Sequence, residues 1–279
     1  DNTPSTPSSA ASDVYKRQVL ATHNETATGV KSDIAAVRRA MDTAGHPALL
    51  FVDGVSSIGS MDFRFDEWGV DVAVTGSQKG FMLPAGLAIV GFSQRAVDAS
   101  KTAALPRTFF DINDMTKGYN ADAFPYTPPV GLMNGLLLAT ETLLKEGLEN
   151  VFARHTRIAS GIRAAVRAWD LDLCAVSPEV YSDTVSAIKT PEGFNATKIV
   201  TLAADKYGVA FGTGLGEVAG KVLRIGLLGS MTDVMALSGI ATAEMCMVDL
   251  GLDIKLGSGV AAAQDYYRGS ITVPLKVVA

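Results

Sequence analysis

From Val19 onward, hydrophobic positions along the chain follow two alternating patterns, short apolar runs and longer helical periods. Residues Ile34, Val37 and Met41 repeat every three or four positions, which predicts a helix over 31–44 with one buried face. The apolar runs predict buried strands at 49–52, 70–75 and 87–91. Helices that alternate with unbroken apolar strands indicate an α/β fold, with a largely parallel sheet covered on both faces.

The pattern changes after Lys101. The stretch 106–129 is aromatic and nearly aperiodic, so we expect an irregular excursion over the surface. Two helical segments are predicted over 130–169, with Gly147 as the break between them. The rest of the chain has the pattern of a smaller α+β domain. Its strands are expected at 184–188, 209–211 and 222–225, and its helices at 195–207 and 232–250.

These patterns divide the 279 residues into three segments. Residues 1–18 are rich in Ser, Thr, Pro and Ala and have no apolar periodicity, so we expect a disordered or non-native tail. A large α/β domain is expected over 19–146, and a smaller domain over 147–279. The large domain is the expected place for a ligand, because open α/β sheets bind ligands at the ends of their strands.

Composition and charge exclude several classes of function. Hydrophobic residues make up 48% and charged residues 19%, as in a folded protein rather than a disordered one. A formal charge of -5 without a basic block argues against nucleic-acid binding. The uncharged stretch 123–140 contains three prolines, so no membrane span is expected. Cys174 and Cys246 form neither a disulfide framework nor a metal-ligand cluster, which predicts a cytoplasmic protein without a metal site.

Two charged residues follow successive strands of the expected sheet. Asp53 closes the run LLFVD, and Lys79 lies in TGSQKG just past the next strand. A lysine can hold pyridoxal phosphate as a Schiff base, while an acidic residue pairs with the protonated pyridine nitrogen of that cofactor. The alternatives for each residue alone are a turn-forming aspartate and a solvated lysine.

Three further places carry candidate chemistry. The polar cluster THNETATGV at 22–30 suits either a polar ligand at a helix N-terminus or a plain helix start. Arg224 lies in the apolar run VLRIG, where its charge needs an anion, either a substrate carboxylate or an internal Asp or Glu. His23 is a candidate for contact with an aromatic cofactor or for a capping or core role, whereas His46 and His155 are expected to be surface or structural residues.

Four motifs occur in a characteristic order: HNETATGV, VDGVSSIG, TGSQKGFMLPAG and VLRIGLLG. With them the chain resembles the class V pyridoxal-phosphate aminotransferases, specifically the serine-glyoxylate enzymes and their alanine-glyoxylate relatives, from Val19 to about Gly269. The resemblance implies fold type I, pyridoxal 5'-phosphate as cofactor, amino acid and 2-oxo acid substrates, and a homodimer with shared active sites. The implied reaction converts serine and glyoxylate into hydroxypyruvate and glycine. Alanine or another small amino acid is the alternative donor.

The same resemblance implies roles for the matching residues. Lys79 forms the Schiff base and moves the α-proton, Asp53 pairs with the pyridine nitrogen, and Arg224 binds the substrate α-carboxylate. Three other residues are expected to hold the cofactor: Thr26 at the phenolic oxygen, Val55 against the ring and Gln78 at the phosphate. A neighbouring subunit completes the phosphate site from the segment FPYTPPV, in which Thr127 matches the family's threonine.

The chain departs from the family pattern in two places. Phe124 stands where the neighbouring subunit's tyrosine is expected, so Tyr126 is its substitute. The Gly-rich phosphate loop and the ring-stacking aromatic residue have no counterpart before Val19, which indicates an N-terminally truncated sequence. A non-catalytic fragment is therefore the alternative from a different class. A cysteine desulfurase is disfavoured, since those enzymes carry His where this chain has Gln78.

Overall fold

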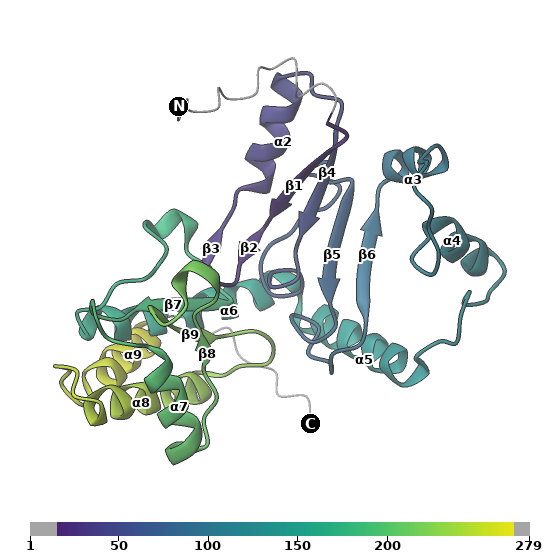
Figure 1. Ribbon diagram of the computed structural model, residues 1–279. Helices are drawn as coiled ribbons and strands as arrows, with labels where there is room; N and C mark the ends of the chain where they lie inside the picture. The colour runs from purple at the N-terminus through teal and green to yellow at the C-terminus, as the bar shows by residue number, and fades with distance from the viewer. Residues whose placement is uncertain (1–15, 271–279) are drawn as a thin grey trace.

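The computed structural model describes residues 16–270. Residues 1–15 of the expected tail and 271–279 of the expected smaller domain lie outside the described residues. The first strand begins at Gln18, the last residue of the segment expected as a tail. Figure 1 shows an upper part built on a sheet and a lower part rich in helices.

A four-stranded sheet forms the upper part, with strand order β1-β4-β5-β6. Three of its strands are parallel, namely β1 (Gln18–Thr22), β4 (Leu49–Asp53) and β5 (Val72–Gly76). The edge strand β6 (Ala88–Phe92) runs antiparallel to β5, so the largely parallel sheet is confirmed. The register pairs Thr22 with Asp53, and Asp53 with Val74, so the carboxyl ends of three strands share one edge.

Helix α2 (Ile34–Thr43) covers one face of this sheet. The side chain of Asp33 caps its start by accepting a hydrogen bond from the amide of Ala36 at 2.8 Å, so the helix begins later than the predicted position 31. Its buried face meets apolar residues of the sheet, and the cluster comprises Ile34, Met41, Ala48, Leu50, Val52, Val70 and Ala73. This cluster is the hydrophobic core of the upper part.

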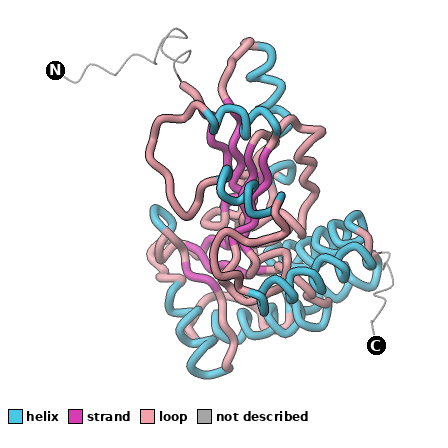
Figure 2. Tube along the Cα trace, turned by 90° about the vertical axis from the view of Figure 1, so that its right-hand side faces the viewer, coloured by secondary structure: helices cyan, strands magenta, loops and turns pink. Residues whose placement is uncertain are grey.

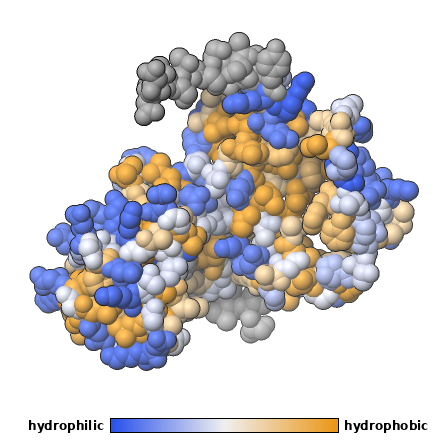
Figure 3. Space-filling model, in the orientation of Figure 1, coloured by the Kyte–Doolittle hydropathy of each residue, from blue (hydrophilic) through white to orange (hydrophobic). Residues whose placement is uncertain are grey.

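The opposite face of the sheet is open among the described residues. Leu20 is 74% exposed and Phe92 is 43% exposed. A hollow of about 340 Å³ lies along β1, β4 and β5, with Asp53 among its lining residues. Figure 3 shows apolar side chains gathered over this region. The expectation that both faces are covered is therefore wrong for residues 16–270. The apolar sequence of a strand indicates that its side chains favour burial, but it does not indicate whether another segment of the chain packs on them.

The segment after the sheet contains more helix than expected. Helix α3 (Gln94–Lys101) has no counterpart among the predicted elements, and α4 (Ile112–Asn120) lies inside the stretch 106–129 expected to be irregular. Hydrophobic periodicity arises from a buried helix face, and α4 buries no residue. Its local support is the side chain of Asp111, which accepts a hydrogen bond from the amide of Asn113 at 2.8 Å.

Helices α5 (Val130–Glu146) and α6 (Leu148–Ala168) confirm the two predicted helical segments. Gly147 separates them with a φ of 85°, a conformation that glycine adopts without a steric penalty. Helix α5 passes beneath the lower ends of β5 and β6 (Figure 1). Among residues 16–270, no helix combines the length and apolarity that crossing a membrane requires.

The lower part has its own antiparallel sheet, in the order β7-β9-β8. Its strands are β7 (Val185–Lys189), β8 (Gly212–Thr213) and β9 (Val222–Gly226). Its other helices are α7 (Thr197–Tyr207), α8 (Asp233–Asp249) and α9 (Ser258–Gly269). The strand predicted at 209–211 is misplaced, since β8 follows it, and α9 has no predicted counterpart. Figure 2 shows the two groups of strands one above the other.

Four short elements complete the described chain. Strands β2 (Asn24–Glu25) and β3 (Val30–Lys31) pair antiparallel immediately after β1. Single 3-10 turns occupy Pro178–Val180 and Gly216–Val218. The polar cluster at 22–30 therefore contributes to a strand pair and its turn, which corrects the expectation of a helix N-terminus there.

Candidate active site

Asp53 lies at the shared edge of the parallel strands. Its main-chain oxygen accepts a hydrogen bond from the amide of His23 at 2.9 Å, which ties β4 to the end of β1. Its Oδ1 accepts a hydrogen bond from the amide of Val55 at 2.9 Å. The side chain is exposed, and no cation within residues 16–270 forms an ion pair with it. The strand edge therefore presents an oriented carboxylate that keeps an oxygen available for a ligand.

Lys79 follows β5 in a turn that rests on the turn after β4. A Cβ built on Gly80 would lie 2.2 Å from the carbonyl oxygen of Ile58 and 2.9 Å from the Cα of Gly59. Glycine, which has no side chain, permits this approach of the two backbones. The motifs VDGVSSIG and TGSQKG thus pack directly against each other, and this contact brings Lys79 to the edge that carries Asp53.

The side chain of Lys79 is half-buried, and within residues 16–270 its ammonium group has neither a hydrogen bond nor an ion pair. Gln78 is exposed, and its amide lies over Gly76, where an added Cβ would be 2.7 Å from Oε1 of Gln78. Val55 is half-buried on the neighbouring turn. These three side chains therefore surround the strand edge without being committed to partners in the described chain.

Thr26 lies in the turn between β2 and β3. Its hydroxyl donates to Oγ of Ser56 at 2.8 Å, and the hydroxyl of Ser56 donates to the main-chain oxygen of Asn24 at 2.9 Å. The chain passes through Gly29 with a φ of 66°, and a Cβ there would lie 3.0 Å from the carbonyl oxygen of Val185 in β7. The turn that carries Thr26 is therefore held by both the upper and the lower part of the molecule.

Arg224 reaches the site from β9. Its Nε donates to the main-chain oxygen of Thr213 at 2.6 Å, and Nη1 donates to that of Thr26 at 3.1 Å. No carboxylate within residues 16–270 forms an ion pair with it, so the alternative of an internal Asp or Glu partner is wrong. Burial lowers the pKa of Arg224, while the nearby Glu25 raises it. A guanidinium bound only to carbonyl oxygens keeps its charge available to an anion.

His23 is a core residue rather than part of the ligand edge. Its Nδ1 lies 2.9 Å from Oγ of Ser57, and its ring packs against Phe63 and Trp68, with centroids at 5.4 and 5.7 Å. Burial, with a smaller effect of Lys31, lowers its pKa to about 4, although Asp62 acts in the opposite direction. The imidazole is thus neutral near pH 7, which supports the core role of the two alternatives.

Tyr126 and Thr127 lie in the loop before α5, apart from these residues. The hydroxyl of Tyr126 accepts a hydrogen bond from the amide of Phe109 at 3.1 Å, and the two rings stack with centroids 4.6 Å apart. Thr127 is exposed. Among the described hydrogen bonds, none joins either residue to Asp53 or Lys79. The structure therefore does not bring this pair into the site of its own chain.

Sequence reasoning missed the residues that hold the site together. Ser56 and Thr184 contribute no charge and stand among ordinary turn residues, so their types alone do not reveal their contacts. The hydroxyl of Thr184 donates to the main-chain oxygen of Ser56 at 2.7 Å and receives a hydrogen bond from Nδ2 of Asn24 at 2.9 Å. The sequence could have indicated Asn24 and Ser56, because they lie within the motifs HNETATGV and VDGVSSIG.

The described site has three charged groups at one edge of the sheet, and each of them can bind a further partner. Asp53 suits a protonated ring nitrogen, Lys79 suits a covalent bond to an aldehyde carbon, and Arg224 suits a carboxylate. This donor set fits pyridoxal phosphate and an amino acid. Together with a mostly parallel sheet that α2 covers on one face, it defines the fold-type-I class of pyridoxal-phosphate-dependent transferases.

The chain belongs to the aminotransferase class-V family, whose family model matches residues 11–232. The match includes residues 11–18, the last portion of the segment expected as a tail. Members of this family depend on pyridoxal phosphate and act on amino acid and 2-oxo acid substrates.

Curated relatives and a solved structure agree with this assignment. The chain is 73% identical over 263 residues to an L-aspartate–glyoxylate aminotransferase of Paracoccus denitrificans, covering 94% of the chain and 66% of the relative. It is 55% identical to a serine–glyoxylate aminotransferase of Hyphomicrobium methylovorum, covering 92% and 64%. A pyridoxamine-pyruvate aminotransferase structure from Mesorhizobium loti matches with a TM-score of 0.85 and 33% identity, covering 92% and 66%. The chain thus spans slightly less than two thirds of these proteins.

Proposed function

We propose that this chain carries active-site residues of a pyridoxal-phosphate-dependent aminotransferase that converts serine and glyoxylate into hydroxypyruvate and glycine. The observation that carries the proposal is the set of Asp53, Lys79 and Arg224, three charged groups with unused capacity around one sheet edge. The names of relatives that are 55% and 52% identical support serine as donor and glyoxylate as acceptor.

Each of the three groups has a separate task in this proposal. The carboxylate of Asp53 keeps the pyridine nitrogen protonated, because a neighbouring negative charge favours the charged form of a base. The Nζ of Lys79 holds the cofactor and then carries the proton that leaves the substrate Cα. The guanidinium of Arg224 orients the substrate α-carboxylate. Pyridoxal phosphate, when bound, supplies the electron sink for this reaction.

The remaining cofactor contacts are proposed from the same motifs. Thr26 meets the phenolic oxygen, Val55 packs on the ring and Gln78 helps to hold the phosphate group. Their side chains border the edge that carries Asp53, and none is buried in the core of the upper part.

A homodimer completes the proposal. Tyr126 and Thr127 would reach the phosphate site of a second copy, since they do not contact the site of their own chain among the described residues. Helix α5, which follows them, exposes large apolar side chains that suit an interface, and these are Val130, Met133, Leu137, Leu138 and Leu144. Sedimentation of the purified protein should give the mass of a dimer, and a monomer at micromolar concentration would contradict it.

Two further assignments concern the domain boundary and the location of the protein. We place the boundary between the two domains at Gly147, which divides 19–146 from 147–279, because the hydrophobic cores of the upper and lower parts are separate clusters. We also propose a cytoplasmic location, since Cys174 and Cys246 are both free thiols.

Aspartate is the second candidate donor, because the relative at 73% identity is named for it. Alanine has no comparable support. Glycine formation from glyoxylate should be measured with serine, aspartate and alanine at equal concentrations. The highest kcat/KM with serine supports the proposal, and the highest value with aspartate replaces the donor but keeps the acceptor.

Cofactor attachment is the direct test of the site. The purified protein should develop a visible absorbance band when pyridoxal phosphate is added, and borohydride reduction should leave the label on Lys79. Lys79→Ala should abolish the label, whereas Lys255→Ala should retain it, because Lys255 is exposed in the lower part and lies outside the site motifs. A folded protein without the band would support the non-catalytic alternative.

A further inference from the structure

Ser56 is surrounded by hydrogen-bonding groups at the edge of the site. It is 4% exposed, and Asn24 beside it is 3% exposed. Its Oγ receives a hydrogen bond from the hydroxyl of Thr26 at 2.8 Å and another from Nδ2 of Asn24 at 3.0 Å. Its own proton goes to the main-chain oxygen of Asn24 at 2.9 Å. A buried serine without a charge thus contacts a residue that the proposed function assigns to the cofactor.

These contacts use the full capacity of the Ser56 hydroxyl. A hydroxyl group has one proton and two lone pairs. The proton is donated to Asn24, and both lone pairs accept hydrogen bonds, one of them from Thr26. The contact between the two hydroxyls therefore uses the proton of Thr26, and the oxygen of Thr26 keeps only lone pairs for a ligand.

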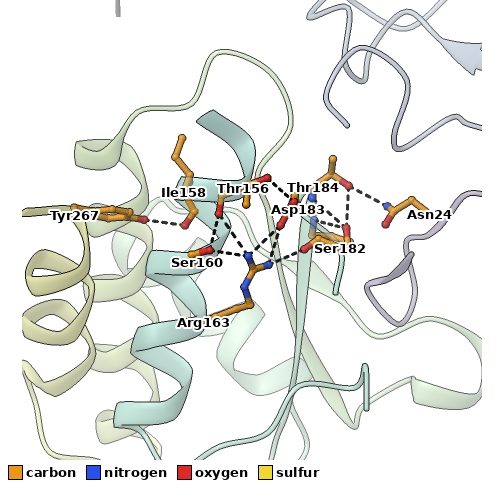
Figure 4. A network of polar contacts seen from close by, with 10 residues as sticks. Asn24, Thr156, Ile158, Ser160, Arg163, Ser182, Asp183, Thr184 and Tyr267 are labelled. Atoms are coloured by element: carbon orange, nitrogen blue, oxygen red, sulfur yellow. Dashed lines mark hydrogen bonds and ion pairs between the residues drawn. The ribbon is translucent and has the colours of Figure 1, made fainter. Parts of the chain in front are cut away.

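The lower part of the molecule contacts the same group of residues through Thr184. The hydroxyl of Thr184 donates to the main-chain oxygen of Ser56 at 2.7 Å, and it accepts from Nδ2 of Asn24 at 2.9 Å. Figure 4 shows Thr184 between Asn24 and Ser182, next to the ion pair of Arg163 and Asp183. If Ser56 turned its proton toward Thr26, the main-chain oxygen of the buried Asn24 would lose a donor, which is unfavourable in a buried site.

We propose that Ser56 is a positioning residue that takes the hydroxyl proton of Thr26, so that Thr26 meets the phenolic oxygen of the cofactor as an acceptor and not as a donor. This inference rests on the proposed function, in which Thr26 contacts that oxygen. A donor would stabilise negative charge on the phenolic oxygen, and an acceptor does not. Ser56 thereby raises the pH at which the bound cofactor loses a proton.

The other charged groups around the site are the same in every variant used below. They are Asp53 at the end of β4, Lys79 after β5, Arg224 in β9 and Glu25 in β2. Their influence on the bound cofactor therefore cancels when variants are compared with the unchanged protein.

The test is a pH titration of the visible absorbance of the protein loaded with pyridoxal phosphate. Ser56→Ala frees the proton of Thr26, which can then be donated to the phenolic oxygen, so the apparent pKa of the band should fall by about one unit. Thr26→Val should not raise that pKa, because the hydroxyl it removes was not a donor to the cofactor. The double variant should have the pKa of Thr26→Val, because Ser56→Ala then has no hydroxyl proton to free.

A matched control and a folding control accompany these variants. Ser60→Ala removes another buried hydroxyl, which has no hydrogen-bond partner within the described residues, and should leave the pKa unchanged. Thermal unfolding without cofactor should show that Thr26→Val and Ser56→Ala are not additive, as expected of hydrogen-bonded partners.

The outcomes separate this inference from the proposed function. A band whose pKa rises in Thr26→Val, or does not move in Ser56→Ala, overturns the inference while leaving the proposed function intact. If Ser56→Ala does not fold, the Thr26→Val result alone decides the question. Absence of the band and of the Lys79 label in the unchanged, folded protein overturns the proposed function and this inference with it.

Discussion

The upper and lower parts of the molecule bury their apolar residues to different extents. In the lower part, helices α6 to α9 share one hydrophobic core with β7 and β9, and Ile199, Ile240 and Met247 are fully buried. In the upper part, a single face of the sheet is packed on α2, while Leu20 on the other face is 74% exposed. Apolar strands of similar composition thus end in different environments. The candidate site lies where the two parts meet, with Asp53 from the upper and Arg224 from the lower.

The largest expected effect concerns a buried carboxylate of the lower part. Glu244 is 1% exposed and accepts hydrogen bonds from Nε1 of Trp169 at 2.8 Å and from the amides of Gly257 and Gly259. Glu244→Ala would leave these donors unpaired and should lower the free energy of unfolding by about 4 kcal/mol. Urea denaturation measures this loss of free energy. The control Glu192→Ala changes an exposed residue and should alter the free energy of unfolding by under about 0.5 kcal/mol.

The next effect is a pH dependence that belongs to the upper part. His23 has its pKa lowered to about 4, so the unfolded state binds more protons than the folded state between that value and about 6.5. Stability should therefore fall by about 3 kcal/mol as the pH decreases from about 7 to about 4. Denaturation at several pH values measures the loss, and His23→Gln should reduce it. An imidazole NMR signal that titrates near pH 6.5 would contradict the assignment.

A smaller effect is expected where the two motif turns meet. Gly80→Ala places a methyl group 2.2 Å from the carbonyl oxygen of Ile58, so the turns must separate. We expect a loss of about 2 kcal/mol of stability and a weaker borohydride label on Lys79. The control Gly269→Ala has nothing within 4 Å of the added methyl group and should retain both. Normal labelling of Gly80→Ala would show that this contact does not position Lys79.

The smallest expected effect tests the open face directly. Leu20→Ser changes a side chain that is 74% exposed, so the free energy of unfolding should change by under about 0.5 kcal/mol. Ile240→Ser, in the closed core, should cost about 3 kcal/mol or more. A large loss from Leu20→Ser would mean that the face is covered in solution, and the contrast between the two parts would disappear.

Most of the sheet and the longer helices could be predicted, because their periodicity reflects burial on one face. The strand 49–52 and the helices over 130–169 are examples. Helix α4 buries nothing and left no such pattern. Helix α9 begins at Ser258, where Glu244 of α8 accepts hydrogen bonds from the amides of Gly257 and Gly259. Glu244 lies 13 residues before Gly257, so this contact depends on how the chain folds after α8.

The sequence by itself determined which chemical groups are available at the site. Asp53 ends one apolar strand and Lys79 follows the next, and parallel strands bring their carboxyl ends to one edge. Only the tertiary structure decided how these groups are paired. Arg224 contacts two carbonyl oxygens instead of a carboxylate, and Thr26 gives its proton to Ser56. Such pairings depend on distances between residues far apart in the chain, which the order of residues does not specify.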